Sequence, residues 1–134
     1  MSPTTEFDST GIDSTAIVAR YLAVWNEPDA VARRAAIADI WLPEATEFVH
    51  EVQFRGHEEL EARVIRAHQA FVASGKYTVA GAGDVTSHGD IVTFTAQLVT
   101  PGGEVDWESR VFLLLGPDGR IEEDYQLTIK PLPA

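Results

Sequence analysis

The 134-residue chain contains no cysteine. It can therefore form no disulfide, no thiolate metal site and no cysteine nucleophile. Positive charge is also scarce, because 10 Lys and Arg residues stand against 21 Asp and Glu residues, which gives a formal net charge of −11. Nucleic acids and anionic membrane surfaces are bound by clustered Lys and Arg, so the composition argues against both as partners.

Long apolar runs are missing as well. The longest ones extend over only a few residues, which is too short to span a membrane. Residues 1–12 lack the basic start and the apolar core of a signal peptide, and we expect them to form a flexible tail. The remainder, residues 13–134, has the size of one domain. Together these features predict a single cytoplasmic domain.

The first half of the chain has the apolar spacing of helices. Asp13 or Ser14 can cap the first helix, and Pro28 separates it from the second. The predicted elements are helices over residues 13–25, 29–41 and 56–75 and a small hairpin of two strands over residues 46–49 and 52–54.

From Tyr77 onward, the pattern changes to the alternation of strands. Short turns separate the strands, and the turn over residues 116–119 combines a preset φ, an Asx bond and a tolerated positive φ. Long antiparallel strands twist, so the sheet should curl. The predicted long strands cover residues 77–88, 90–100, 105–115 and 120–130. The chain therefore predicts an α+β fold, in which a cone-shaped, curved antiparallel sheet of four long strands and the short hairpin packs on three N-terminal helices.

The two faces of the last hairpin decide which side chains enter the interior. The row that contains Trp107 is the more apolar one of its strand, so Glu108 and Arg110 are expected on the outer face. On the last strand, the apolar row contains Tyr125 and is expected inside. A single bulge would exchange the rows and bring Glu108, Arg110 and Asp124 into the interior. We favour the first placement, and the second stays open.

Four short stretches occur in this order of elements: YLAVW at residues 21–25, WLPEAT at 41–46, FRGHEEL at 54–60 and DGRI at 118–121. Together they resemble the nuclear transport factor two-like superfamily, which includes ketosteroid isomerases, SnoaL-like polyketide cyclases and limonene-epoxide-hydrolase-type proteins. The resemblance covers roughly residues 14–130 and implies the cone fold. It leaves the activity open, because this fold hosts isomerases, cyclases, hydrolases and non-enzymes.

The resemblance also implies positions for functional residues. The carboxylate base of ketosteroid isomerases lies near the end of the first short strand, which corresponds here to Val49 or His50. The epoxide hydrolases use an Arg and an Asp on one strand with an Asp on its neighbour, and the nearest match is Glu108 with Arg110 opposite Asp124. Proteins of this fold commonly dimerise through the outer sheet face, so a homodimer is expected.

The interior of such a cone is the expected site for an apolar small molecule. Aromatic side chains from the helices and strands are the candidates for its wall: Tyr21, Trp25, Trp41, Phe54, Phe71 and Trp107. The alternative is that these side chains form an ordinary packed core.

Four residues are candidates for catalysis: His50, His68, Asp124 and Tyr125. Either histidine could move a proton, because imidazole accepts and releases protons near neutral pH. Asp124 would orient or protonate the ligand, and the Tyr125 hydroxyl would polarise a ligand oxygen. Each histidine has a structural alternative, a loop residue for His50 and a hydrogen-bonded core residue for His68, as does Tyr125.

Two functional hypotheses follow. The first is a cofactor-independent enzyme that isomerises, cyclises or opens an epoxide in an apolar substrate by acid–base catalysis. The second is a non-catalytic ligand-binding or homodimerisation module of the same fold. No metal site is expected in either case, since the four histidines are scattered and match no ligand motif.

Overall fold

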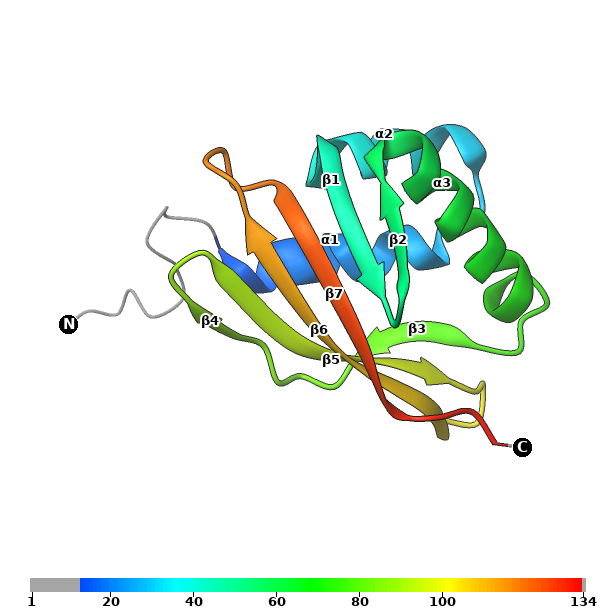
Figure 1. The fold of residues 1–134 in the computed structure, drawn as a ribbon. Coiled ribbons are helices and arrows are strands. Elements are labelled where there is room, and N and C mark those ends of the chain that lie inside the picture. The colour runs from blue at the N-terminus through cyan, green and yellow to red at the C-terminus, as the bar shows by residue number, and fades with distance from the viewer. Residues whose placement is uncertain (1–12, 134) are drawn as a thin grey trace.

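The computed structural model describes residues 13–133, so the predicted flexible tail, residues 1–12, lies outside the described residues. Helices cover one side of a curved, unclosed, seven-stranded sheet (Figure 1). The helical elements are α1 (Ser14–Asn26), α2 (Ala30–Ile40), α3 (Gly56–Ala67) and the π-helical turn η2 (His68–Val72). The strands are β1 (Trp41–Val49), β2 (Val52–Arg55), β3 (Thr78–Gly81), β4 (Thr86–His88), β5 (Ile91–Val99), β6 (Val105–Leu115) and β7 (Ile121–Lys130). This α+β architecture confirms the predicted fold class.

An aspartate caps each of the first two helices. The Asp13 carboxylate accepts hydrogen bonds from the backbone N–H groups of Thr15 and Ala16. Asp29 accepts one from the backbone N–H of Ala32 at 2.8 Å. Such caps satisfy donors that have no partner in the first helical turn. The cap of the first helix was predicted from the sequence, whereas Asp29 was not proposed as a cap.

The strand order is β2-β1-β7-β6-β5-β3, and β4 pairs with the same strand, β5, as β3 does. The strands from β5 to β7 form the predicted antiparallel meander. The prediction of a purely antiparallel sheet is wrong at one pairing, because β1 lies parallel to β7. The two strands are far apart in the chain, and β1 joins the free edge of the meander beside its last strand (Figure 1).

The predicted strand over residues 77–88 is interrupted. It forms β3 and β4, which pair with opposite ends of β5. Gly83 has a φ of +80° in the connection, and the Asp84 carboxylate accepts hydrogen bonds from the backbone N–H and the hydroxyl of Thr95. A Cβ atom on Gly81 would lie 3.1 Å from the Leu22 side chain, so the strand end packs closely against α1. Asp84 and these glycines turn the chain between the two strands.

The turn between β6 and β7 follows the sequence prediction. The Asp118 carboxylate accepts a hydrogen bond from the backbone N–H of Arg120, which is the expected Asx bond, and Gly119 has a φ of +84°. On β6, the buried row contains Ser109, Val111 and Leu113, as predicted. Local turn chemistry and side-chain alternation therefore describe the first strand of this hairpin correctly.

The prediction for β7 is wrong beyond its first residue. Leu115 pairs with Ile121 but Leu114 pairs with Glu123, so Glu122 is an extra residue, a β-bulge, in this strand. A bulge exchanges the faces of all residues that follow it. Asp124 consequently has no exposed surface, whereas Leu127 on the row predicted to be inside is 53% exposed. Exposed Tyr125 and Ile129 share this placement on the outer row.

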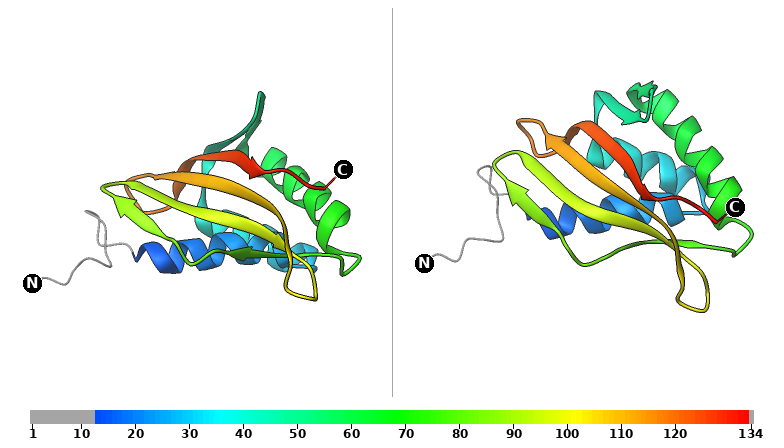
Figure 2. Two further views of the ribbon diagram at one scale, coloured as in Figure 1. Left: turned by 90° about the horizontal axis from the view of Figure 1, so that it is seen from below. Right: turned by 60° about the horizontal axis from the view of Figure 1, so that its bottom comes forward.

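The core lies between the sheet and the helices. Figure 2 shows the sheet curving over α1, with α3 along its side. Tyr21 is central to the core, because its ring packs against the rings of Trp25, Trp41 and Phe94 at centroid distances of 5.5–5.9 Å. Within residues 13–133, no helix is both long enough and apolar enough to cross a membrane.

Candidate functional site

A pocket of about 190 Å³ lies between the helices and the inner face of the sheet. Its apolar lining consists of Trp25, Val49, Ala67, Phe71, Val72, Val79, Ala96, Leu98, Trp107 and Leu132. The remaining lining residues carry polar groups: Tyr21, His50, Arg63, Gln126 and Thr128. An apolar chamber with a few polar groups is the usual composition of a small-molecule site.

Four of the six residues predicted for the wall line this pocket: Tyr21, Trp25, Phe71 and Trp107. Trp41 is instead fully buried in the core against Tyr21. Phe54 lies beneath the guanidinium groups of Arg63 and Arg66, which are 5.6 and 6.0 Å from its ring centroid. Trp41 is therefore an ordinary core residue, and Phe54 packs against Arg63 from outside the pocket.

The end of the third helix contributes to the pocket through a π-turn. The sequence predicts one regular helix over residues 56–75, but α-helical geometry ends at Ala67 and η2 continues it. The carbonyl of His68 accepts a hydrogen bond from the backbone N–H of Ala73, five residues later. Phe71 and Val72 of this turn line the pocket. Single π-turns within helices are rare and frequently occur at functional sites.

A network of polar side chains extends from the pocket wall into the core. The Tyr21 hydroxyl donates to the Asp124 carboxyl group at 3.3 Å and accepts from the Gln126 amide at 2.6 Å. The same Gln126 nitrogen also donates to Glu47 at 2.8 Å. Arg63 donates to Glu47 at 3.1 Å and to the Gln126 oxygen at 3.3 Å. Four elements, α1, β1, α3 and β7, thus converge on one hydrogen-bonded cluster.

Strand register explains why two carboxyl groups meet in this cluster. Glu47 on β1 and Asp124 on β7 are direct partners in the parallel pairing, and both are fully buried. The next pair along the strands, Phe48 and Tyr125, points to the opposite face, where the two rings stack at 4.7 Å. The bulge at Glu122 is the reason that Asp124 and not Tyr125 faces Glu47.

The buried acid pair holds one proton. Burial raises the pKa of the Asp124 carboxyl well above its ordinary value, and the neighbouring Glu47 carboxylate raises it further. Burial also raises the pKa of Glu47, but the Arg63 guanidinium opposes this effect. The negative charge therefore resides on Glu47 and the proton on Asp124. The buried Asp124 Oδ2 atom accepts no hydrogen bond. Protonation explains this, because a protonated Oδ2 can donate a hydrogen bond to Glu47.

Tyr21 is the link between this acid pair and the pocket. Burial, followed by the charges of Asp124 and Glu47, raises the pKa of the Tyr21 hydroxyl well above its ordinary value. Tyr21 therefore remains a neutral O–H donor. Tyr21 lines the pocket and its hydroxyl bonds to Asp124, so a single side chain connects the pocket wall with the buried acid pair.

The two candidate histidines have different environments. His50 lies at the exposed tip of the β1–β2 hairpin with a φ of +54°, and it lines the pocket. Its Nε2 atom is 3.4 Å from the Thr128 hydroxyl. His68 is buried, and its Nδ1 atom is 3.1 Å from the Trp25 carbonyl, which requires an Nδ1–H donor. His68 is absent from the pocket lining, so only His50 is placed to contact a ligand.

Tyr125 is not placed as predicted. Its hydroxyl donates to Glu123 on the outer face at 2.7 Å, so the expected contact with a ligand oxygen in the interior is wrong. The alternative in which three charged residues enter the interior is correct only for Asp124. Glu108 and Arg110 remain outside, where Glu108 accepts from Gln97 and Arg110 pairs with Asp84.

Sequence reasoning missed Glu47, Arg63 and Gln126. Glu47 alternates with Phe48 in a short strand, and Arg63 lies among other charged residues of α3, so both have the pattern of solvent-exposed side chains. Gln126 belongs to the row that was predicted to lie outside. No local signal distinguishes these residues from surface residues, since their burial depends on distant strands. Across residues 13–133, no group of three His, Asp or Glu side chains is arranged to hold a metal ion.

Neither a protein-family model nor a curated protein sequence matches the chain. Solved structures do match. A SnoaL-like family protein from Agrobacterium tumefaciens, provisionally named an isomerase, is 26% identical, with a TM-score of 0.77 over 86% of this chain and 96% of that chain. A protein from Jannaschia sp., provisionally named a SnoaL-like polyketide cyclase, is 20% identical, with a TM-score of 0.67 over 96% and 92%. A provisionally named ketosteroid isomerase from Kribbella flavida is 13% identical, with a TM-score of 0.63 over 90% and 83%. The last two likenesses establish the fold alone.

Proposed function

The chain has the nuclear transport factor two-like fold of SnoaL-like polyketide cyclases and ketosteroid isomerase-like proteins, and from this premise we propose that it is an enzyme. It uses acid–base catalysis by its own side chains on a small, largely apolar molecule in the pocket. Isomerisation, cyclisation and epoxide opening are the reactions of this type. All three move a proton while charge develops on an oxygen atom.

One observation carries this proposal: a carboxyl group, Asp124, whose pKa is raised by burial and by Glu47, lies behind the pocket wall and is bonded to it through Tyr21. A buried ionisable pair contributes little net stability, because desolvation offsets the attraction between the charges. Strongly shifted carboxyl groups next to a pocket are instead typical of catalytic sites. A simple packed core would not require a buried acid pair that contributes little net stability.

The roles of the pocket residues follow from their positions. His50 at the rim accepts or releases the proton that moves, because it is the lining residue with an imidazole group. Arg63 places its positive charge near an oxygen that becomes negative. Glu47 and Gln126 hold Arg63 in place.

Replacement of His50 tests the catalytic proposal. One well-placed acid or base accelerates a reaction roughly 10²–10⁴-fold, so His50→Gln should lower kcat by about this factor. Turnover is screened with enones, epoxides and linear poly-ketones, and product formation is followed by mass spectrometry. His88→Gln is the matched control, because His88 is exposed on β4 and outside the pocket lining.

If His50→Gln and the wild type turn over equally, His50 has no catalytic role. If none of these classes is converted by the wild type, the enzyme proposal fails and the second candidate, a binding or dimerisation module, is the better description.

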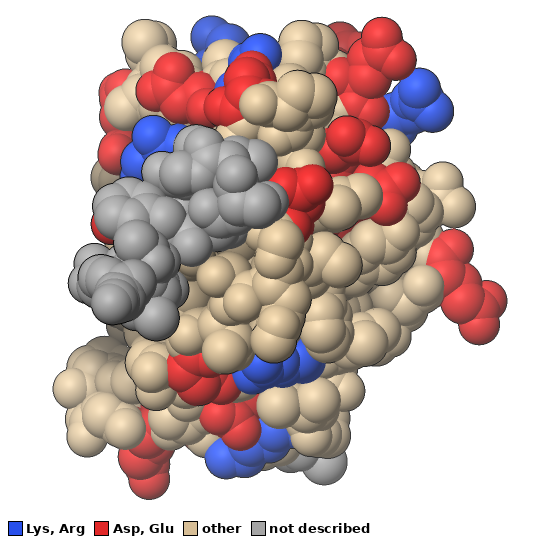
Figure 3. All heavy atoms as spheres, turned by 90° about the vertical axis from the view of Figure 1, so that its left-hand side faces the viewer, with Lys and Arg blue, Asp and Glu red and all other residues tan. Residues whose placement is uncertain are grey.

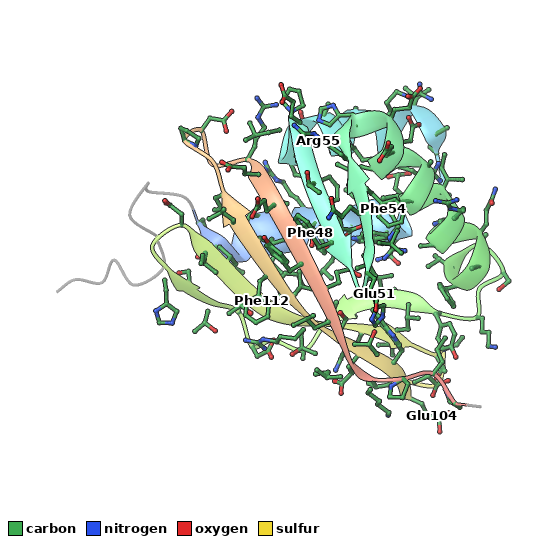
Figure 4. All side chains as sticks on the ribbon, in the orientation of Figure 1. Phe48, Glu51, Phe54, Arg55, Glu104 and Phe112 are labelled. Carbon is green, nitrogen blue, oxygen red and sulfur yellow. The ribbon has the colours of Figure 1, made fainter. Side chains whose placement is uncertain are left out.

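That second candidate is favoured by the outer sheet face. Phe48, Tyr125 and Phe112 are register neighbours on β1, β7 and β6 and form an aromatic row on this face. Figure 4 labels Phe48 and Phe112 of this row. Exposed Leu127 continues the apolar surface, and both Glu108 and Arg110 lie near it. We propose that a second copy of this chain covers the face. A two-fold axis places the same apolar row against itself and allows acidic and basic side chains to pair.

A further inference from the structure

We propose that the pocket holds a neutral molecule about the size of a single ring, and that an acceptor oxygen of this molecule binds the Arg63 guanidinium. The inference rests on the proposed function only in that it takes this pocket as the ligand site. It adds the size, the charge and the anchoring residue of the ligand.

The volume sets the size of the ligand. An apolar cavity of about 150 Å³ accommodates one benzene molecule, whereas pockets for drug-sized ligands have roughly 300–1,000 Å³. The pocket in this protein has about 190 Å³, which is enough for one ring with a few additional atoms. Phe71 and Leu132 also line a neighbouring, separate pocket of about 350 Å³. A molecule of four fused rings is too large for the chamber.

Arg63 supplies the anchor for an oxygen. A guanidinium group has five N–H donors, and Arg63 uses two of them, one toward Glu47 and one toward Gln126. Within residues 13–133, the other three have no hydrogen-bond acceptor, and Arg63 lines the pocket. The Tyr21 hydroxyl and the Gln126 amide nitrogen already donate to partners inside the cluster. Arg63 is therefore the charged donor of the pocket lining that remains available to a ligand.

Two aromatic rings and one carboxylate hold the guanidinium group in a fixed orientation. Its carbon lies 5.1 Å from the ring centroid of Trp25 and 5.6 Å from that of Phe54. The Glu47 carboxylate fixes its Nε edge at 3.1 Å. A fixed donor loses little conformational freedom when a ligand binds, which favours both affinity and catalysis.

The charge balance selects a neutral ligand. The positive charge of Arg63 is balanced by the fully buried Glu47, and Asp124 beside it is protonated. Gln126 and the rings of Trp25 and Phe54, which complete the surroundings of the guanidinium group, carry no charge. A carboxylate ligand would add a second negative charge within a largely apolar chamber, at a cost in desolvation. A carbonyl or epoxide oxygen uses the same donors without this cost.

Binding of three matched compounds tests the inference without any need for turnover. Cyclohexanone, methylcyclohexane and cyclohexanecarboxylate share one ring and differ in the polar group. Their Kd values are measured by NMR titration, with the indole N–H signals of Trp25 and Trp107 as reporters in the pocket lining. Cyclohexanone should bind roughly ten- to hundredfold more tightly than methylcyclohexane, the range for a hydrogen bond to a charged group, and also more tightly than the carboxylate. A four-ring ketone should bind more weakly than cyclohexanone.

Variants assign this preference to Arg63. In Arg63→Met, cyclohexanone and methylcyclohexane should bind with similar Kd values. Because this change leaves Glu47 buried without its partner, the double variant Arg63→Met, Glu47→Gln provides the same test in a cluster that has lost both charges. Arg66→Met is the matched control and should retain the preference, because Arg66 is exposed on the same helix and lies outside the pocket lining.

The inference is overturned if the carboxylate binds most tightly, if the four-ring ketone binds more tightly than cyclohexanone, or if no compound binds. It is also overturned if the preference for the ketone persists in both variants without Arg63. The predicted binding pattern without any catalytic turnover would support this inference while removing the proposed enzyme. Catalytic turnover together with an unchanged preference for the ketone in the Arg63 variants would support the proposed enzyme and overturn this inference.

Discussion

Asp124 is the residue at which the site and the stability of the protein are most directly connected. Its carboxyl group is fully buried beside Glu47, and the pKa of the group in the folded protein lies well above the ordinary value. In the unfolded chain the same group titrates at its ordinary pKa, about 3.9. Between these two values the folded protein retains a proton that the unfolded chain has released.

This difference determines how stability depends on pH. The contribution of Asp124 to the free energy of unfolding is complete below the ordinary pKa and is lost as the pH rises through the raised pKa. Asp124→Asn, which cannot ionise, should remove this loss. The free energy of unfolding of the variant relative to the wild type should therefore increase from pH 4 to pH 8, as measured by urea denaturation.

Asp39→Asn is the control for this measurement, since Asp39 is exposed on α2. A constant difference between Asp124→Asn and the wild type over this pH range would mean that Asp124 is ionised in the folded protein. The one-proton description of the Glu47–Asp124 pair would then be wrong.

At the scale of elements, the bulge in β7 determines which chemistry faces the interior. Glu122 is the extra residue between Ile121, which pairs with Leu115, and Glu123, which pairs with Leu114. If Glu122 instead paired with Leu114 as an ordinary strand residue, regular alternation from Ile121 would turn Asp124 and Gln126 outward. The site therefore depends on Glu122 remaining outside the pairing with β6.

Deletion of Glu122 tests whether the register beyond the bulge holds the site. The deletion joins Ile121 to Glu123, which already pair with Leu115 and Leu114, so the buried network of Tyr21, Asp124 and Gln126 should be retained. Glu122→Gln retains the number of residues and should change stability by less than about 0.5 kcal/mol, since Glu122 is exposed. Both variants are compared by thermal and urea denaturation. Unfolding of the deletion variant, or destabilisation by more than about 4 kcal/mol, would contradict this register.

At the scale of the whole molecule, charge and the outer sheet face act in opposite directions. The net charge of −11 causes copies of the chain to repel one another. Figure 3 shows charged side chains toward the upper and lower ends of one side of the molecule, with an uncharged area between them. The aromatic row of Phe48, Tyr125 and Phe112 on the outer sheet face favours association. Added salt screens the repulsion, so a dimer should become tighter as ionic strength increases.

Sedimentation velocity tests the proposed dimer. The wild type should sediment as a dimer, and Leu127→Glu should sediment as a monomer, because Leu127 is 53% exposed on the outer sheet face. Val31→Glu is the matched control and should remain dimeric, since Val31 is 70% exposed on α2, away from the sheet. A monomeric wild type at all salt concentrations, or a dimeric Leu127→Glu variant, would contradict this interface.

Interactions between near neighbours could be predicted from the sequence. The Asp13 cap, the Asp118 turn and the inward row of β6 each depend on a few consecutive residues, and all of them are present as predicted. The resemblance over residues 14–130 also identified the fold, because it used the order of elements and not the position of individual side chains.

Only the tertiary structure decided which side chains form the candidate site. Glu47 and Asp124 are 77 positions apart, and they meet because β1 pairs in parallel with β7 and because β7 contains one extra residue. Neither feature can be predicted from the alternation of apolar and polar residues. The sequence by itself determined the elements and their approximate order, since local propensities act over a few residues. The burial of a charged group depends on every strand and helix that packs around it, and that information exists only in the folded chain.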